Sequence, residues 1–206
     1  MPRKSQFSKE EIAQYGLAIV EEKGIESLTA RELAGRLGTT VAPIFVHYPS
    51  MEDLKQEIRR LAQHIYHGYL QQGLQEEIPF LGVGMQYIAF ARNKPELYYL
   101  LFLSDRGEQS HYAMEELKKT QEFVRESLQK IYRIDGTTAD RYFRDMWLVA
   151  HSLATLLVTG GCDYTEAEIR SILQEFSLSL CKAYKEIEGL AEGTFDCDKE
   201  FRKIIH

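Results

Sequence analysis

The sequence predicts an all-α protein of about nine helices, and three observations support this. Ser or Thr followed three residues later by an acidic residue recurs, as at Ser8 with Glu11 and at Thr165 with Glu168; such capping boxes begin helices. After these starts, apolar residues recur at spacings of three and four, the period of a helix. No stretch of the chain has the strict alternation of a half-buried strand.

The first 48 residues read as a small domain of three helices. The first helix begins at Ser8 and ends at Gly24, and its inner stripe is formed by Ile12, Gly16, Leu17 and Val20. Thr29 with Glu32 forms a second capping box, and the helix that follows carries the apolar stripe Leu33, Ala34 and Leu37. A unit this small buries little surface alone, so we expect it to pack on the helix that follows it.

The turn after the second helix indicates a helix-turn-helix. Gly38 stands where the helix must stop, a place for a residue that tolerates positive φ. Thr39 and Thr40 are candidate caps of the next helix, and Pro43 fits at about its third position, where its missing N–H has no partner to lose. We expect the buried side of this short helix to consist of Ile44, Phe45 and Tyr48. Second helices of this kind lie in the major groove of DNA.

Residues 49–206 read as a larger helical domain. Ser50 with Asp53 opens a long helix, and later starts and stops predict helices over about 51–72, 80–92, 95–103, 111–132, 137–159 and 166–187. We take Gly136 as the end of the fourth of these segments and Thr137 with Asp140 as the start of the next. Residues 197–206 are expected to fray or to form a short terminal helix.

Composition indicates an ordinary globular chain without an export signal. Of 206 residues, 44% are hydrophobic and 27% are charged, which excludes a disordered protein. No apolar run approaches the roughly 20 residues that span a bilayer, and the N-terminus lacks a signal peptide core, so we expect a cytoplasmic protein. The cysteines Cys162, Cys181 and Cys197 are odd in number and lack metal-site spacing, which favours free thiols over a redox or metal role.

The net charge of −6 is unevenly distributed. Residues 1–60 hold nine Lys and Arg and nine Asp and Glu, so the whole excess of acidic residues lies after them. DNA binding needs a local basic surface rather than a basic protein. Six cations of the N-terminal part are candidates for phosphate contacts: Arg3, Lys4, Lys9, Lys55, Arg59 and Arg60.

The run LTARELAGRLGTTVAPIFVHY followed by SMEDL resembles the DNA-binding domain of the tetracycline-repressor (TetR) family. The matching positions are Leu28-Thr29, Leu33-Ala34, Leu37-Gly38-Thr39-Thr40, Ile44 to Tyr48, and Met51 to Leu54. Phe45 replaces a tyrosine and Met51 replaces a lysine of the family pattern, both of which can contact phosphate. The resemblance implies a homodimeric transcriptional regulator, most simply a repressor, that a small molecule releases from DNA.

A second resemblance covers part of the larger domain. Residues 87–102 (YIAFARNKPELYYLLF) with Trp147, His151 and Ser152 are similar to the WHG type of TetR C-terminal domain. Ser152 stands where that pattern has glycine.

The expected DNA contacts lie at the start and on the exposed face of the second helix of the helix-turn-helix. The candidates are Thr29, Thr39, Thr40, Val41, Ala42, Pro43, Phe45, His47, Tyr48 and Lys55, with Val46 beside them. Val41, Ala42 and Pro43 can pack on thymine methyl groups, and the lack of arginine here favours partial readout of DNA shape. Thr40 can equally be the helix cap, His47 a surface residue and Tyr48 a core residue. Lys55 can replace the lysine missing at Met51.

The aromatic richness of residues 80–160 predicts an apolar pocket for a small-molecule effector. Its candidate lining is Tyr66, Met85, Phe90, Tyr98, Phe102, Met114, Trp147 and His151. The alternative is that these residues form ordinary helical core. His64 and His67 have a spacing that can serve a metal, but no further ligand completes a set, and we expect no metal and no cofactor.

The last two long helices carry more apolar residues than one small bundle needs. Leu148, Ala150, Leu153, Ala154, Leu157, Ile169, Ile172, Leu173, Phe176, Leu180 and Ala183 can pair with a second copy of the chain or pack within one chain. A two-fold dimer would place its recognition helices about 34–36 Å apart on a palindromic operator.

Two other functions are compatible with this fold class. One is an all-helical enzyme, although the common nucleotide, hydrolase and metalloprotease motifs are absent from the sequence. The other is a protein-interaction module that keeps the helix-turn-helix fold without binding DNA, since fold alone does not determine function.

Overall fold

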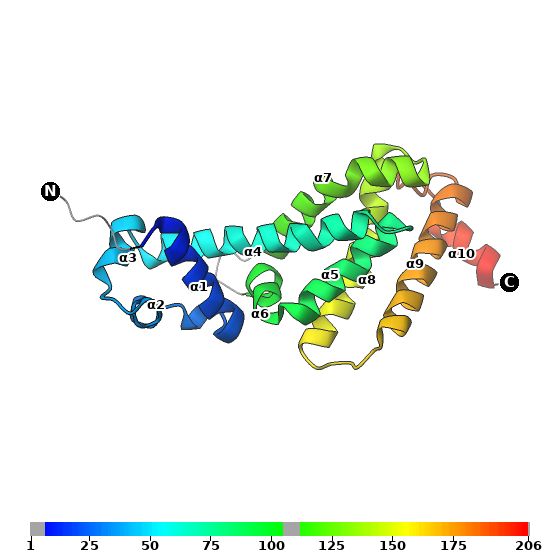
Figure 1. Ribbon diagram of the computed structural model, residues 1–206. Helices are drawn as coiled ribbons and strands as arrows, with labels where there is room; N and C mark the ends of the chain where they lie inside the picture. The colour runs from blue at the N-terminus through cyan, green and yellow to red at the C-terminus, as the bar shows by residue number, and fades with distance from the viewer. Residues whose placement is uncertain (1–6, 105–111, 206) are drawn as a thin grey trace. The chain divides into compact units, whose positions relative to one another are not determined.

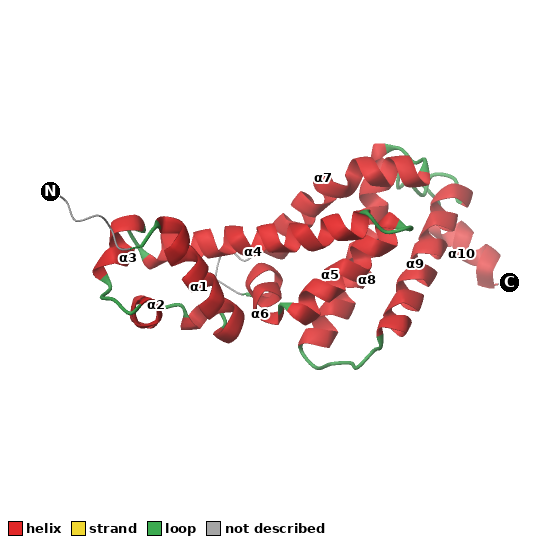
Figure 2. Ribbon diagram, in the orientation of Figure 1, coloured by secondary structure: helices red, strands yellow, loops and turns green. Residues whose placement is uncertain are grey.

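The computed structural model describes residues 7–104 and 112–205, and every regular element in these ranges is a helix (Figure 2). The predicted all-α fold is therefore confirmed, with ten α-helices in the described part of the chain instead of about nine. The chain forms two compact units, Met1–Tyr69 with Phe90–Ala113, and Leu70–Ala89 with Met114–His206. The division at residue 48 was drawn around the three N-terminal helices, and it stays a prediction.

The first unit contains the N-terminal helices and a short helical insertion from later in the sequence. Figure 1 labels its elements, which are α1 (Lys9–Lys23), a 3₁₀ turn (Ile25–Ser27), α2 (Ala30–Leu37), α3 (Ala42–His47), the larger part of α4 (Met51–Leu74), α6 (Pro95–Tyr98) and a π-helical segment (Tyr99–Leu103). Gly16 lets α1 approach α4, because a Cβ at this position would lie 3.1 Å from Cδ1 of Ile58. Farther along α4, Tyr66 packs against Phe90 and against Phe102, with ring centroids 5.3 Å apart in each pair.

The second unit is a helical bundle. It contains most of α5 (Pro79–Asn93) together with α7 (Tyr112–Tyr132), α8 (Gly136–Val158), α9 (Glu166–Glu186) and α10 (Cys197–Ile205). The helix start expected at His111 lies outside the described residues. Phe80 packs on Tyr142 and Phe143 in the centre of this unit, with ring centroids 5.1 and 6.3 Å apart. No helix among the described residues is long and apolar enough to cross a membrane.

The local signals fixed most helix starts but not all of them. Both hydrogen bonds of the capping box are present at Ser8 and at Thr165. At Thr29 the hydroxyl accepts from the N–H of Glu32, but the Glu32 carboxylate pairs with Lys23 at 2.8 Å, so only half of the expected box forms.

The predicted start of α8 was wrong by two residues. Asp135 caps the helix, and its carboxylate accepts from the N–H groups of Thr137 and Thr138 at 2.8 and 3.1 Å. Gly136 is thus the first residue of α8 and not the end of the preceding helix. Asp140, expected to cap this helix, pairs instead with Arg125.

Candidate nucleic-acid interface

The turn between α2 and α3 is built around Gly38. Its backbone has φ 64° and ψ 35°, the left-handed region in which a residue with a Cβ is strained. The N–H groups of Gly38 and Thr39 donate to the carbonyls of Gly35 and Ala34 at 3.2 and 3.0 Å. These bonds satisfy the last carbonyls of α2 and end the helix.

The start of α3 corrects the predicted cap. The N-cap position is Val41, whose backbone is already helical, and no side chain caps this helix. Thr39 and Thr40 therefore lie in the turn before the helix, and Pro43 occupies the second helical position. Thr40 is exposed while Thr39 is half-buried. The Thr40 hydroxyl therefore does not cap α3, and contact of Thr40 with DNA stays a prediction.

The exposed surface of α3 is apolar. Val41, Phe45 and Val46 expose 42, 43 and 72% of their surface, and Ala42 is also exposed. Phe45 was expected on the buried side, and this was wrong. A helix of six residues directs only one narrow side to the core. Ile44 and Tyr48, which are four residues apart, occupy that side and are buried. We call Val41, Ala42, Phe45 and Val46 the apolar α3 surface.

Tyr48 belongs to the core and is not placed as a donor to phosphate. Its hydroxyl donates to the Lys9 carbonyl at 3.1 Å, and the Lys9 ammonium lies 5.2 Å from its ring centroid. Burial, reinforced by the negative charges of Glu57 and Glu10, raises the pKa of Tyr48 to about 12. Tyr48 thus attaches the end of α3 to the start of α1, in agreement with the core alternative given for it above.

His47 is half-buried beside the start of α1. The pKa of Glu10 is lowered mainly because the carboxylate of Glu10 accepts a hydrogen bond from the backbone N–H of Glu10. The charges of Lys9 and His47 lower this pKa further. Thr29 is exposed at the N-terminus of α2. Both residues lie at the surface of the first unit, where the prediction of contact with DNA requires them.

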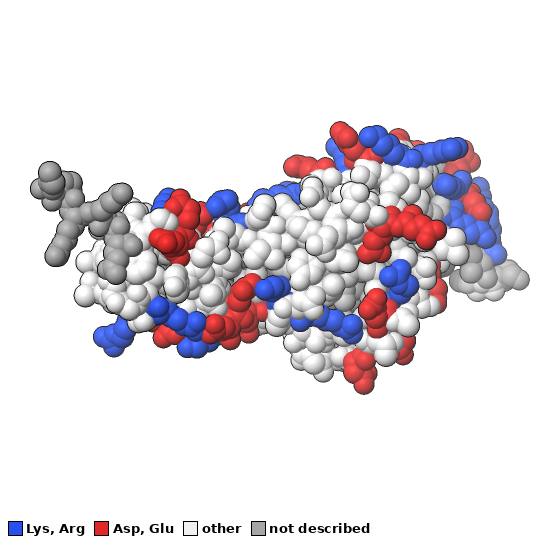
Figure 3. Space-filling model, viewed as in Figure 1, with Lys and Arg blue, Asp and Glu red and all other residues white. Residues whose placement is uncertain are grey.

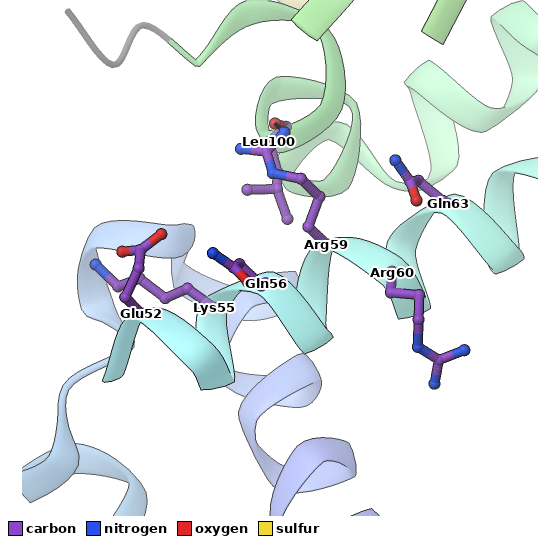
Figure 4. Close-up of a pocket in the computed structure, with 7 residues that line it drawn as sticks. All are labelled: Glu52, Lys55, Gln56, Arg59, Arg60, Gln63 and Leu100. Carbon is purple, nitrogen blue, oxygen red and sulfur yellow. Dashed lines mark hydrogen bonds between the residues drawn. The ribbon is translucent and has the colours of Figure 1, made fainter. Parts of the chain in front are cut away.

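The cations of α4 differ in what they already contact. Lys55, Arg59 and Arg60 line an open cavity of about 270 Å³ together with Gln56 and Gln63 (Figure 4). Arg59 extends toward Leu100 and donates to its carbonyl at 2.7 Å, whereas Arg60 points away and pairs with Glu57 at 2.6 Å. Lys55 forms no ion pair with the described residues, so it is the α4 cation best placed to meet a phosphate.

One exposed cation was missed by the sequence interpretation. Arg31 lies in the first turn of α2, directly after the cap residue and its neighbour. By contrast Arg36, on the same helix, pairs with Glu22 and lies near Glu32. The signal for Arg31 was its position beside the Thr29 cap. Arg3 and Lys4, also predicted to contact DNA, lie outside the described residues.

The eight predicted effector residues divide between the two units. Tyr66, Phe90, Tyr98 and Phe102 belong to the first unit, where they pack mainly on one another. Met85, Met114, Trp147 and His151 belong to the second. Met114 exposes 51% of its surface and does not line an enclosed pocket as expected.

Trp147, His151 and Tyr87 form a compact group in the second unit. The rings of Trp147 and His151 stack with centroids 4.5 Å apart, and Nδ1 of His151 lies 2.9 Å from the Tyr87 hydroxyl. Burial lowers the pKa of His151 below its ordinary value. His151 is thus a half-buried, hydrogen-bonded histidine that stays neutral near pH 7.

The second unit also has an apolar groove that was not predicted. Its volume is about 320 Å³, and it is lined by Ile78, Leu81, Tyr132, Gln174, Ser177, Leu178, Cys181 and Lys185. Burial raises the pKa of the Cys181 thiol, and all three cysteines are free. Within residues 7–104 and 112–205, no three His, Cys, Asp or Glu side chains gather as metal ligands do.

The arrangement of α2, the Gly38 turn and α3 defines the class of protein: a helix-turn-helix protein with its second helix at the surface. Residues 8–58 match the family model described as bacterial regulatory proteins, tetR family. The match covers the three N-terminal helices and the start of α4, and it points to a TetR-type regulator of transcription rather than an enzyme.

The fold as a whole is similar to two solved structures. One is a TetR-family member from Streptomyces coelicolor A3, with a TM-score of 0.59 and 21% identity over 82% of this chain and 98% of that one. The other is a protein of unknown function from Rhodococcus sp. RHA1, with a TM-score of 0.66 and 18% identity over 89% of this chain and 98% of that one. Identities this low support the fold alone. No curated protein matches the sequence.

Proposed function

We propose that this chain is a homodimeric, ligand-responsive regulator that binds a palindromic duplex and represses transcription there. The observation that carries the proposal is the exposed α3 helix within the segment that matches the tetR family model. That match supports the regulator class, and the operator, the dimer, the effector and the sign of regulation are the proposal.

The test is selection of bound sequences from a random duplex pool with the full chain. We expect an inverted repeat whose half-sites lie one helical turn apart, because a two-fold dimer presents two copies of α3. Binding should weaken steeply with salt, since phosphate contacts release counterions. Enrichment of no sequence, or an affinity that is the same at low and high salt, would contradict the proposal.

The dimer is supported by apolar side chains that one chain leaves exposed. Leu148 and Leu156 on α8 and Phe176 on α9 are exposed. Several residues expected at the interface are instead buried within the second unit, namely Ala150, Leu153, Ala154, Ile169 and Leu173. The proposed interface is therefore narrower than expected and is centred on the exposed three, with Ile172, Leu180 and Ala183 half-buried beside Phe176 on α9.

The effector site is proposed at the apolar groove of the second unit. Its volume of about 320 Å³ suits a small molecule. Apolar side chains form most of the lining, and Lys185 supplies one cation at the wall, so an apolar molecule with one acidic group is the best match. A thermal-shift screen with aromatic and medium-chain carboxylates, followed by DNA titration, tests this. A compound that stabilises the chain without changing its DNA affinity is not an effector.

A protein-interaction module is the second candidate. The observation that favours it is the exposed Phe45 and Val46, since apolar surface groups also suit a protein partner. A chain of this kind would bind no duplex even at low salt, so the same titration separates the two functions.

A further inference from the structure

The apolar α3 surface indicates which bases the protein distinguishes. From Thr39 to Tyr48 the sequence contains no Lys, Arg, Asn, Gln, Asp or Glu. In the major groove, Arg and Lys recognise guanine, Asn and Gln recognise adenine, and Asp and Glu accept from cytosine. The usual bidentate contacts to guanine and adenine are therefore unavailable to α3.

The same segment carries the groups that recognise thymine. Apolar side chains contact the C5-methyl group, which projects into the major groove from thymine alone among the four ordinary bases. Val46 exposes 72% of its surface, and Val41 and Phe45, which precede it in the sequence, expose 42 and 43%. In Figure 3 the left end of the first unit, where the chain passes from α2 to α3 in Figure 1, presents mainly uncharged surface.

We propose that the apolar α3 surface recognises thymine methyl groups, so that the operator is rich in T·A pairs at the positions that α3 faces. The inference rests on the proposed function as a DNA-binding regulator. DNA is favoured over a protein occupant because the helices on either side of α3 in the sequence carry exposed or half-buried cations, Arg31 on α2 and Lys55 on α4. The phosphates along both edges of the major groove can pair with these cations, and the thymine methyl groups lie inside the groove between the two rows of phosphates.

The chemical test removes the methyl group and leaves base pairing intact. In the duplex obtained by selection, each thymine is replaced in turn by deoxyuridine, which lacks only the C5-methyl group. We expect the dissociation constant to rise about fourfold for each methyl group that α3 covers, the value of one buried methyl group. Replacing such a T·A pair by C·G should weaken binding. Replacing the cytosine of that pair by 5-methylcytosine should then raise the affinity about fourfold.

The protein test uses a matched pair of exposed β-branched residues. Val46→Ala should abolish the effect of deoxyuridine at the thymine that Val46 contacts, because the contact is already lost. Ile205→Ala on α10 is the control, since Ile205 is exposed to 73% against 72% for Val46, and it should keep the full effect. Both side chains lie mostly in solvent, so the substitutions leave folding unchanged.

The outcomes separate this inference from the proposed function. If the chain selects an operator but deoxyuridine changes its affinity nowhere, methyl recognition is wrong and the regulator function stands. A selected site in which guanine dominates the positions facing α3 would lead to the same conclusion. If the chain binds no duplex at low salt, the proposed function falls and the inference falls with it.

Discussion

At the scale of single residues, His151 couples the stability of the second unit to pH. Burial lowers its pKa below 6.5 in the folded chain, whereas the unfolded chain takes up a proton at about 6.5. As the pH falls through 6.5, the unfolded state therefore binds the proton first and the free energy of unfolding decreases. The slope contributed by this residue is at most about 1.4 kcal/mol per pH unit. The contribution of His151 to the free energy of unfolding is fully present above pH 6.5 and is lost as the pH falls through the lowered pKa of the folded chain.

Urea unfolding at several pH values between 5 and 7.5 measures this slope. The fluorescence of Trp147, the only tryptophan of the chain, reports the unfolding. His151→Gln should flatten the dependence of stability on pH below 6.5. His64→Gln, at an exposed position of α4, is the control and should keep the wild-type slope. Equal slopes for wild type and His151→Gln would show that this histidine is not a neutral half-buried residue.

Lys55 is predicted to act through charge alone. It lies on the second turn of α4 without an ion pair among the described residues, in contrast to Arg60 with its partner Glu57. Lys55→Ala should weaken binding to all duplexes alike and lower the slope of log affinity against log salt by about one unit. Fluorescence anisotropy over a range of salt concentrations measures this. Lys199→Ala on α10 should leave the slope as it is, and a changed base preference without a salt effect would refute the role.

At the scale of elements, α4 and α5 approach each other closely at Gly73 and Gly82. A Cβ on Gly73 would lie 2.5 Å from the carbonyl carbon of Gly82 and from the nitrogen of Val83. Backbone atoms cannot move aside as a flexible side chain can, so Gly73→Ala should destabilise the chain by about 1–3 kcal/mol through overpacking.

Gly68 on the same helix is the matched control for Gly73. Nothing lies within 4 Å of a Cβ placed there, so Gly68→Ala should stabilise α4 by about 1 kcal/mol, the helix propensity difference. Thermal unfolding of both variants gives the comparison. Two shifts of the same sign would mean that the contact between α4 and α5 is looser than the structure has it.

Helix starts could be predicted from the sequence where the cap and its partner are close neighbours and nothing else competes for them. Ser8 with Glu11 is such a case, and both bonds form. The capping box predicted for Thr29 and Glu32 forms only in part, because the Glu32 carboxylate accepts from the ammonium of Lys23, nine residues away. The cap of α3 was missed because Val41 already has helical backbone angles, which a pattern of residue types does not reveal.

The candidate site was predicted in outline for the same reason. The helix-turn-helix has local signals, such as Gly38 and the apolar stripe of α2, and these placed α3 correctly to within two residues. Burial within α3 depends on what packs against it, and only the structure places Phe45 outside and the Tyr48 hydroxyl on the Lys9 carbonyl. The groove lined by Cys181 and Lys185 joins residues far apart in the sequence, which periodicity cannot detect.

At the scale of the whole molecule, charge is distributed in a way that suits selective binding. The first 60 residues are neutral overall, and the remainder carries the net charge of −6. An acidic remainder repels phosphates, so affinity must come from a few cations and from α3 itself. Specific affinity would then depend on engaging two half-sites at once, which joins DNA binding to the dimer.

The final prediction tests that link between the dimer and DNA. Phe176 is exposed on α9, and in the proposed dimer it is covered by the second copy. Phe176→Glu should leave each chain folded, because the new carboxylate lies in solvent in the monomer, but it should block association, because burying an unpaired charge is costly. Sedimentation equilibrium should give the mass of one chain, and affinity for the selected palindrome should fall by roughly 10²–10⁴-fold, the gain from joining two binding sites.

Ile131→Glu on α7 introduces the same charge at another exposed apolar residue of the second unit and should remain dimeric with wild-type affinity. A single half-site duplex should bind wild type and Phe176→Glu almost equally, because each then engages one copy of α3. If Phe176→Glu sediments as a dimer, the interface lies elsewhere on the chain. If Phe176→Glu is monomeric yet binds the palindrome as tightly as wild type, the affinity does not come from two copies of α3 that bind two half-sites at once.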